Sequence, residues 1–119
     1  MSDQVLDPDA IENLRALSPD TDGAFLRELI EIYLQDTPAR FAELDATFAS
    51  GDAPGLMRAA HTIKGSSGNF GASRLAKLAQ EIETHAKAAN LPAAAAVVPE
   101  FKAEYAKVAA ALTQISRGT

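Results

Sequence analysis

Apolar residues recur at steps of three and four along most of this chain, and no other feature limits its fold as strongly. Such spacing places the apolar side chains on one face of an α-helix, whereas a half-buried strand alternates every second residue. No strand-like alternation of competing length is present. Alanine, the strongest intrinsic helix former, makes up about a fifth of the residues. The sequence therefore predicts an all-α fold.

Two helices are predicted in the first half of the chain. Asp7 and Pro8 have the properties of an N-cap and a first helical residue, so a short helix begins there. A turn rich in Ser, Pro, Asp and Gly over residues 18–23 precedes a second apolar stripe. Because Pro38 lacks an amide donor, the chain either kinks or restarts near that residue. We expect one long, kinked helix that ends at about residue 50.

Two more helices follow, each with a clear apolar seam. Asp52 caps the third helix, which stops near Gly71, a residue suited to a left-handed conformation. The fourth helix begins at Ser73 and is stopped by Asn90 and Pro92. The predicted seam residues of these two helices are Leu56, Ala60, Ile63, Ser67 and Phe70, then Leu75, Leu78, Ala79, Ile82 and Ala86.

The last apolar stripe determines the expected architecture. The helix that carries this stripe begins or kinks at Pro99. The alternating steps of three and four between the apolar residues suit antiparallel packing. The members of the stripe are Val98, Phe101, Tyr105, Val108, Leu112 and Ile115. A chain this short needs that face for its own core, which makes a dimerising coiled coil the weaker reading. We expect one domain over residues 1–119, an up-down antiparallel four-helix bundle with a short extra N-terminal helix and flexible ends at about 1–6 and 117–119.

Charge and cysteine content exclude several classes of function. The net charge of −5 and the pI near 4.9 oppose nonspecific binding of nucleic acid, which requires a basic surface. The absence of cysteine and of any apolar run near 18 residues predicts a soluble, cytoplasmic protein without a membrane partner. Two histidines and no cysteine leave too few strong ligands for a metal site. We therefore expect no cofactor or metal of its own.

His61, in the run AAHTIKGSSGNFG, is the candidate reactive residue. On a helical wheel it lies roughly 140° from the centre of the seam, so its side chain should face solvent. Gly65 and Gly68 share that face, although a glycine inside a helix costs about 1 kcal/mol relative to alanine. This pattern predicts a bare surface around an exposed imidazole, open to a second macromolecule.

The neighbours of His61 suggest what an imidazole does there. At neutral pH an unperturbed imidazole is mostly uncharged and has a ring nitrogen able to attack an electrophile. Lys64, three residues on, is placed to stabilise a phosphoryl group on His61, and Arg58 adds to the positive field. No Asp or Glu lies three or four residues away in either direction. The electrophile and any metal are therefore expected from a partner.

The stretch AAHTIKGSSGNFGASRLAKLAQEIE resembles the signature of histidine phosphotransfer (HPt) domains. That signature is a histidine followed by apolar-Lys-Gly-Ser-Ser, small residues, Leu-x-x-Leu and apolar-Glu. The matching positions are His61, Ile63, Lys64, Gly65, Ser66, Ser67, Gly71, Ala72, Leu75, Leu78, Ile82 and Glu83. Phe70 stands where a smaller aliphatic residue is expected and Ala79 where cysteine is frequent, and both changes keep the position apolar.

The resemblance implies that His61 accepts a phosphoryl group from a receiver-domain phospho-aspartate and transfers it to an aspartate of another receiver. It implies response-regulator receiver domains and a hybrid sensor histidine kinase as partners, with Mg²⁺ held by the receiver. It also implies that the chain has no kinase activity of its own, in agreement with the absence of a glycine-rich ATP loop. We expect a monomer.

The expected docking surface comprises Met57, Arg58, Gly65, Gly68 and Ala72. Two other functions stay open from the sequence. The chain could be a helical adaptor that binds a receiver or kinase without carrying phosphate, or the histidine-bearing module of a two-helix sensor-kinase dimer. Among the remaining polar residues, Ser66 could contact the phosphoryl group, Ser67 is interpreted as structural, and His85 is assigned no function.

Overall fold

The computed structural model describes residues 5–17 and 23–118, and all regular secondary structure within these ranges is helical. All turns and caps connect helices, and no strand occurs there. The all-α prediction is therefore confirmed, while residues 18–22 of the predicted first turn lie outside the described ranges. The helices are α1 (Pro8–Ala16), α2 (Ala24–Ser50), α3 (Ala53–Gly68), α4 (Ser73–Lys87) and α5 (Leu91–Gly118).

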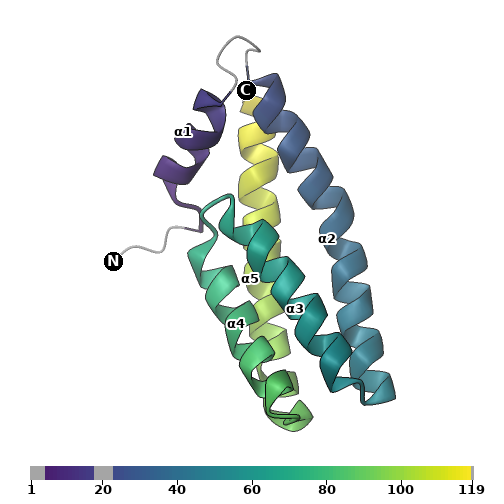
Figure 1. Ribbon diagram of the computed structural model, residues 1–119. Helices are drawn as coiled ribbons and strands as arrows, with labels where there is room; N and C mark the ends of the chain where they lie inside the picture. Colours follow the sequence, from purple (N-terminus) through teal and green to yellow (C-terminus); the bar gives the residue numbers. More distant parts are fainter. Residues whose placement is uncertain (1–4, 18–22, 119) are drawn as a thin grey trace.

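The four longer helices lie side by side, and the chain reverses direction from each to the next (Figure 1). Consecutive helices from α2 to α5 pack against one another, and α2 also contacts α5. The α3–α4 contact is the most extensive and the α2–α5 contact the least extensive of these four. The helix that contains His61 thus belongs to the most closely packed pair.

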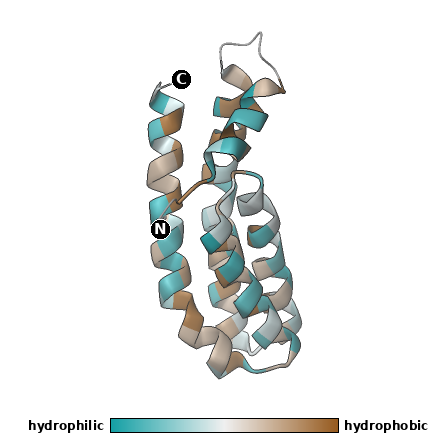
Figure 2. Cartoon of the chain, turned by 90° about the vertical axis from the view of Figure 1, so that its left-hand side faces the viewer, coloured by the Kyte–Doolittle hydropathy of each residue, from teal (hydrophilic) through white to brown (hydrophobic). Residues whose placement is uncertain are grey.

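The core consists of the apolar stripes predicted from the sequence. Every seam residue of α3 and α4 is buried, as are three members of the α5 stripe, Phe101, Val108 and Leu112. Val98, Tyr105 and Ile115 are partly buried against this core. Figure 2 shows hydrophobic and hydrophilic residues alternating around the helices. No helix in the described ranges is long and apolar enough to cross a membrane.

Two prolines lie inside helices. Pro38 is part of a continuous α2, so one long helix is confirmed there and a restart does not occur. Pro99 lies in the middle of α5, which begins at Leu91, so the prediction that Pro99 could begin this helix is wrong. A proline leaves the carbonyl four residues earlier without its amide partner. Ala95 and Pro99 are both exposed, so water can satisfy that carbonyl.

The signals predicted to stop α4 instead begin α5. α4 ends at Lys87, and Asn90 then caps the next helix by accepting a hydrogen bond from the amide of Ala93 at 3.2 Å. Pro92 occupies the first turn of α5, where its missing amide has no helical partner in any case. The other two predicted caps are confirmed, because Asp7 accepts from the Asp9 amide and Asp52 from the Gly55 amide.

The N-terminal segment is attached to the turn between α3 and α4. The amide of Asp7 donates to the carbonyl of Gly71 at 3.0 Å. Gly71 has a φ of +70°, and a Cβ at this position would lie 2.5 Å from the Cβ of Asp7. Val5 and Leu6, which belong to the end predicted to be flexible, are partly buried against the core. Only glycine therefore allows this close approach of α1 to the turn that follows the His61 helix.

Candidate functional site

His61 projects from the outer face of α3, as its place on the helical wheel predicts. Its side chain is 66% exposed, while Ala60 and Ile63 on the same helix are fully buried. The inner face of α3 is packed into the core, and the imidazole on its outer face is accessible from solvent. A large partner can therefore approach this ring without any rearrangement of the core.

The two glycines of this face leave open space. A Cβ added at Gly65 or Gly68 would meet no side chain or neighbouring element within 4 Å. Packing inside the described protein therefore does not require glycine at either position, although each costs about 1 kcal/mol of helix stability relative to alanine. The observation supports the interpretation that the bare surface accommodates something outside the chain.

Glu83, from α4, is the direct partner of the histidine. Its Oε2 lies 3.0 Å from Nδ1 of His61, and its side chain is only 18% exposed. No carboxylate lies one turn before or after His61 on its own helix. The carboxylate comes instead from the neighbouring helix, 22 residues further along the chain.

Lys64 is held by the same helix. Its Nζ lies 2.8 Å from Oε1 of Glu83 and 2.8 Å from Oε1 of Gln80. Gln80 in turn donates from its Nε2 to Oγ1 of Thr84 at 3.0 Å. Lys64 is 28% exposed, and its ammonium is directed at acceptors on α4 rather than extending into solvent.

The charge on Glu83 determines which nitrogen of His61 is free. Burial by itself would raise the pKa of Glu83, but hydrogen bonds from Lys64 and His61 outweigh that effect and lower the pKa below its ordinary value of 4.5. An ionised carboxylate only accepts hydrogen bonds, so Nδ1 of His61 must carry the proton. Nε2 then has a lone pair, and no hydrogen-bond partner for it occurs among the described residues. This nitrogen is therefore open to contact with a partner.

The predicted docking residues do not all reach the surface. Gly65, Gly68 and Arg58 are exposed, and Met57 is half-buried against the core. Ala72 has no exposed surface, so the prediction that it contributes to docking is wrong. It packs inward at the turn where α3 gives way to α4, because that turn folds back over the core.

Three other polar residues of this region do not contact His61, Lys64 or Glu83 through their side chains. The hydroxyl of Ser66 bonds carbonyls of its own helix and so is already satisfied. Ser67 is fully buried and shares a 2.7 Å hydrogen bond with the Tyr33 hydroxyl on α2, which confirms its structural interpretation. His85 is half-exposed, as expected for a residue without an assigned role.

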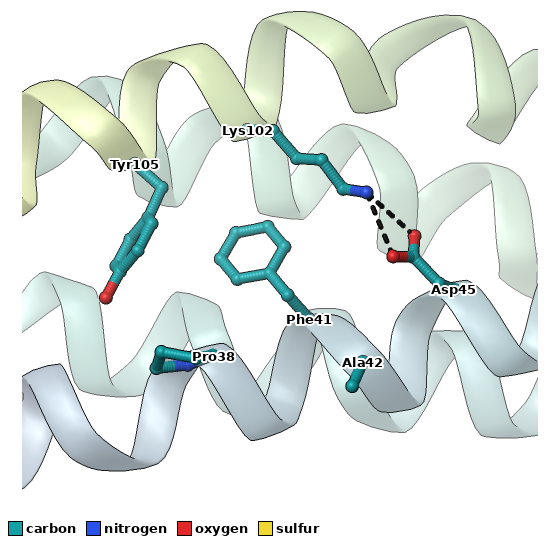
Figure 3. Close-up of a pocket in the computed structure, with 6 residues that line it drawn as sticks. All are labelled: Pro38, Phe41, Ala42, Asp45, Lys102 and Tyr105. Carbon is teal, nitrogen blue, oxygen red and sulfur yellow. Dashed lines mark hydrogen bonds and ion pairs between the residues drawn. The ribbon is translucent and has the colours of Figure 1, made fainter.

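Two hollows lie elsewhere on the surface. One of about 480 Å³ lies between α2 and α3 and is lined by polar residues that include Arg40 and Arg58. The other, of about 370 Å³, lies between α2 and α5 over Phe41 and Tyr105, with Lys102 and Asp45 joined across its edge (Figure 3). Neither includes His61. No group of three or more metal-ligating side chains gathers in residues 5–17 and 23–118.

Glu83 and Gln80 are the site residues that the sequence analysis did not assign. Glu83 belongs to the apolar-Glu end of the signature, and it directly follows the buried seam residue Ile82. A residue beside the seam of an antiparallel neighbour faces the adjoining helix. This position in the sequence could have indicated that Glu83 faces α3. No comparable sequence feature indicates a role for Gln80.

The chain is similar to known proteins of one family. The Hpt domain family model matches residues 28–111. A search of curated proteins gave no match. The crystal structure of histidine-containing phosphotransfer protein B (HptB) from Pseudomonas aeruginosa is similar at 28% identity with a TM-score of 0.89, covering 99% of each chain. The matched span includes His61, Lys64, Gln80 and Glu83, and the chain belongs to the Hpt domain family.

Proposed function

We propose that this protein is a phosphorelay intermediate that carries a phosphoryl group on Nε2 of His61. The observation that carries the proposal is an exposed imidazole whose Nδ1 lies 3.0 Å from a carboxylate oxygen of the partly buried Glu83. Family membership and the similarity to a phosphotransfer protein support the same role. The donor is a phospho-aspartate of one receiver domain, and the acceptor is an aspartate of another.

The transfer balances without any proton leaving the histidine. The Nε2 lone pair attacks phosphorus in line, an N–P bond forms, and the P–O bond to the aspartate breaks. The aspartate carboxylate leaves with the electron pair. The ring then bears a positive charge, with Nδ1–H directed at ionised Glu83, which stabilises that charge. Attack by a second aspartate on the phosphohistidine reverses these steps and regenerates the neutral ring.

Lys64 and the partner supply the remaining charge stabilisation. An ammonium group has three donors, and two of them already have acceptors on α4. We assign the third to an oxygen of the bound phosphoryl group. Mg²⁺ is expected on the receiver, which brings the electrophile, so this chain requires no cofactor of its own. Transfer catalysis is thus shared between the two proteins.

The remaining predictions belong to this proposal. Met57, Arg58, Gly65 and Gly68 form the expected docking surface for receiver domains and for a hybrid sensor histidine kinase. The chain directions in Figure 1 favour an up-down four-helix bundle with α1 as the extra helix. Because α2 to α5 already enclose a core within one chain, we expect a monomer rather than a two-helix kinase dimer, which light scattering can test.

The deciding experiment is phosphoryl transfer from a panel of phosphorylated receivers. The wild-type protein should gain an acid-labile, alkali-stable phosphate, and His61→Gln should gain none. His85→Gln is the matched control, since it removes the other imidazole, and it should accept phosphate normally. Transfer to His61→Gln at the normal rate would refute the assignment. Equal receiver binding by both variants with no transfer to the wild type would instead support the adaptor alternative.

A further inference from the structure

We infer that the hollow between α2 and α5 is a binding site for a small aromatic zwitterion, the class to which the free aromatic amino acids belong. The ring of the ligand lies over Phe41, its carboxylate pairs with Lys102 and its ammonium pairs with Asp45. The hollow includes neither His61 nor Lys64. The inference is therefore independent of phosphoryl transfer.

The hollow has the size of a small-ligand site. Its volume is about 370 Å³, and it is lined by Pro38, Phe41, Ala42 and Asp45 of α2 and by Lys102 and Tyr105 of α5. Ligand pockets in proteins begin at about 300 Å³ and combine apolar walls with a few polar groups. One aromatic ring with a short polar group matches the lower end of this range.

The space is left open where the bundle is least closely packed. Of the four contacts between the longer helices, the one between α2 and α5 is the least extensive. The lining positions of α2 are three, four and seven residues from the first, so they share one face of the helix. Ala42 on this face is exposed and carries only a methyl group, so it does not fill the space beside Phe41.

The apolar wall of the hollow is held in place before any ligand binds. The ring of Phe41 lies 5.0 Å from that of Phe101 and 5.1 Å from that of Tyr105. Figure 3 shows Phe41 between Tyr105 and the pair formed by Lys102 and Asp45. Because these rings pack against one another, a ligand ring can join them without the entropic cost of ordering a flexible side chain. This wall selects a flat apolar group.

The polar end of the hollow offers both signs of charge. Nζ of Lys102 lies 3.0 Å and 2.9 Å from the two oxygens of Asp45, and the two side chains are about half exposed. An ion pair with this exposure is weak and can open at little cost. A ligand with a carboxylate and an ammonium on one carbon atom can enter the opened pair and give each residue a new partner of opposite charge.

Ligands with a single charge fit this end less well. A cation would pair with Asp45 and leave Lys102 beside it without an acceptor. An anion would pair with Lys102, leave Asp45 unpaired and approach a chain of net charge −5. A zwitterion satisfies both residues and has no net charge to be repelled.

The hollow is separate from the surface expected to dock receivers. Contacts join α2 to α3, α3 to α4, α4 to α5 and α5 back to α2. The seam between α2 and α5 therefore lies opposite the seam between α3 and α4. A ligand in the hollow leaves His61 accessible.

The direct test is a titration of the ¹⁵N-labelled protein with L-tryptophan, followed by ¹H–¹⁵N NMR. Amide shifts around Ala42 and Lys102 should change and saturate, with a dissociation constant of about 1 mM or lower. L-Alanine has both charges but no ring, while tryptamine and indole-3-propionate keep the ring and lose one charge each. Each of these three probes should bind at least about tenfold more weakly.

Variants locate the site. Lys102→Met and Asp45→Asn each remove one charge and should weaken L-tryptophan binding about tenfold. Ala42→Leu adds bulk at an exposed position of α2 with a good helix former, so the protein should fold and its filled hollow should bind no L-tryptophan. Lys107→Met, at a lysine of α5 outside the hollow, is the matched control and should bind as the wild type does. Circular dichroism checks the folding of each variant.

Thermal unfolding supplies the second readout, and the possible failures are distinguishable. A ligand that binds only the folded state raises the unfolding midpoint, so L-tryptophan should raise it for the wild type but not for Ala42→Leu. No saturation up to about 10 mM L-tryptophan, or normal binding by Ala42→Leu, would overturn the site. Equally tight binding of tryptamine or indole-3-propionate would overturn the zwitterion as its ligand. Since neither assay contains a receiver, these results leave the proposed phosphoryl transfer to its own test.

Discussion

Two lysine–carboxylate pairs join helices in the part of the chain that the structure describes, and they differ in what surrounds them. Lys64 and Glu83 join α3 to α4 at 2.8 Å, with side-chain exposures of 28% and 18%. Lys102 and Asp45 join α2 to α5 at 2.9 Å, with exposures of 46% and 53%. Both oxygens of Asp45 face the same ammonium (Figure 3), whereas Glu83 has one oxygen left for His61. The second oxygen of Glu83, partly shielded from water, links this ion pair to the histidine of the proposed phosphoryl-transfer site.

The surroundings of the two pairs are equally different. Phe41 stacks against Phe101 at 5.0 Å and Tyr105 at 5.1 Å between α2 and α5. The face around His61 instead carries two glycines with nothing against them. The α2–α5 side should therefore govern stability, and the α3–α4 face should govern transfer. Substitutions on the two sides can test this division.

The largest expected effect is on stability, from the α2–α5 side. Phe101→Ala removes a fully buried ring and should lower the free energy of unfolding by about 3–5 kcal/mol. Urea unfolding followed by circular dichroism measures this loss. The fraction that remains folded should transfer phosphate at the wild-type rate. A specific loss of transfer per folded molecule would show that the two sides are coupled.

The next effect is on transfer, from the α3–α4 face. Glu83→Gln keeps the shape of the side chain but no longer forces the proton onto Nδ1, so transfer should slow about ten- to a hundredfold, as when other oriented histidines lose their partner. Stopped-flow or quench measurements with a phosphorylated receiver give the rate. Glu81→Gln, at an exposed carboxylate of the same helix, should leave the rate unchanged.

Glu83→Gln should also change how the stability of the fold depends on acidic pH. Because the pKa of Glu83 in the folded protein lies below its ordinary 4.5, ionised Glu83 stabilises the fold above about pH 4.5. That contribution is lost as the pH falls through the lower, folded-state pKa. The stability difference between wild type and Glu83→Gln should therefore narrow with acidification. A difference that stays constant down to acid unfolding would contradict the lowered pKa.

Tyr33 links the two sides and should show an intermediate effect. Its hydroxyl bonds Ser67 on α3, while its ring packs against Tyr105 on α5. Tyr33→Phe leaves the buried Ser67 hydroxyl without this partner and should cost about 1–2 kcal/mol at neutral pH. Urea unfolding measures the change, and Tyr105→Phe gives a comparison at a less buried hydroxyl.

Alkaline titration sharpens that experiment. Burial raises the pKa of Tyr33 to about 12 from 10.0, so the folded state keeps a proton that the unfolded chain releases. The contribution of Tyr33 is complete below pH 10 and is lost as the pH rises toward 12. The deficit of Tyr33→Phe relative to wild type should shrink over that window. Burial also raises the pKa of Tyr105. The free energy of unfolding of Tyr33→Phe should therefore still depend on pH in this range.

The smallest effect is expected from the exposed pair. Lys102→Met should change the free energy of unfolding by less than about 1 kcal/mol, because surface ion pairs are screened by water. Transfer should be unaffected. Lys64→Met, measured in the same two assays, should slow transfer, because the carboxylate partner of Lys64 also contacts His61. Equal effects of the two lysine variants on transfer would remove the distinction between the pairs.

The apolar pattern predicted the helices and the seams well, because burial on one face follows directly from a period near 3.6 residues. Every predicted seam residue of α3 and α4 is buried, and the exposure of His61 follows from the same wheel. Local caps such as Asp52 were equally readable, since a cap acts within three residues of the chain. Features that depend on a single helix are therefore accessible from the sequence.

Features that depend on how two helices meet could not be predicted from the sequence. The contact of His61 with Glu83 spans 22 residues and requires the register of α3 against α4, which no local pattern contains. Ala72 lies in a turn, so it belongs to no periodic stripe, and its burial was missed. Pro99 was interpreted as the start or a kink of the last helix. The start is wrong because α5 tolerates this proline in its interior, where water can reach the exposed carbonyl of Ala95.

The tie between Asp7 and Gly71 bears on where a minimal version of this protein can be cut. The family match begins at residue 28, after α1 and the start of α2, and ends at residue 111. A fragment with those boundaries would lose the buried Ile11, Leu26 and Leu112 and would uncover the turn beneath Asp7. The region that matches the family is thus smaller than the unit that must fold cooperatively.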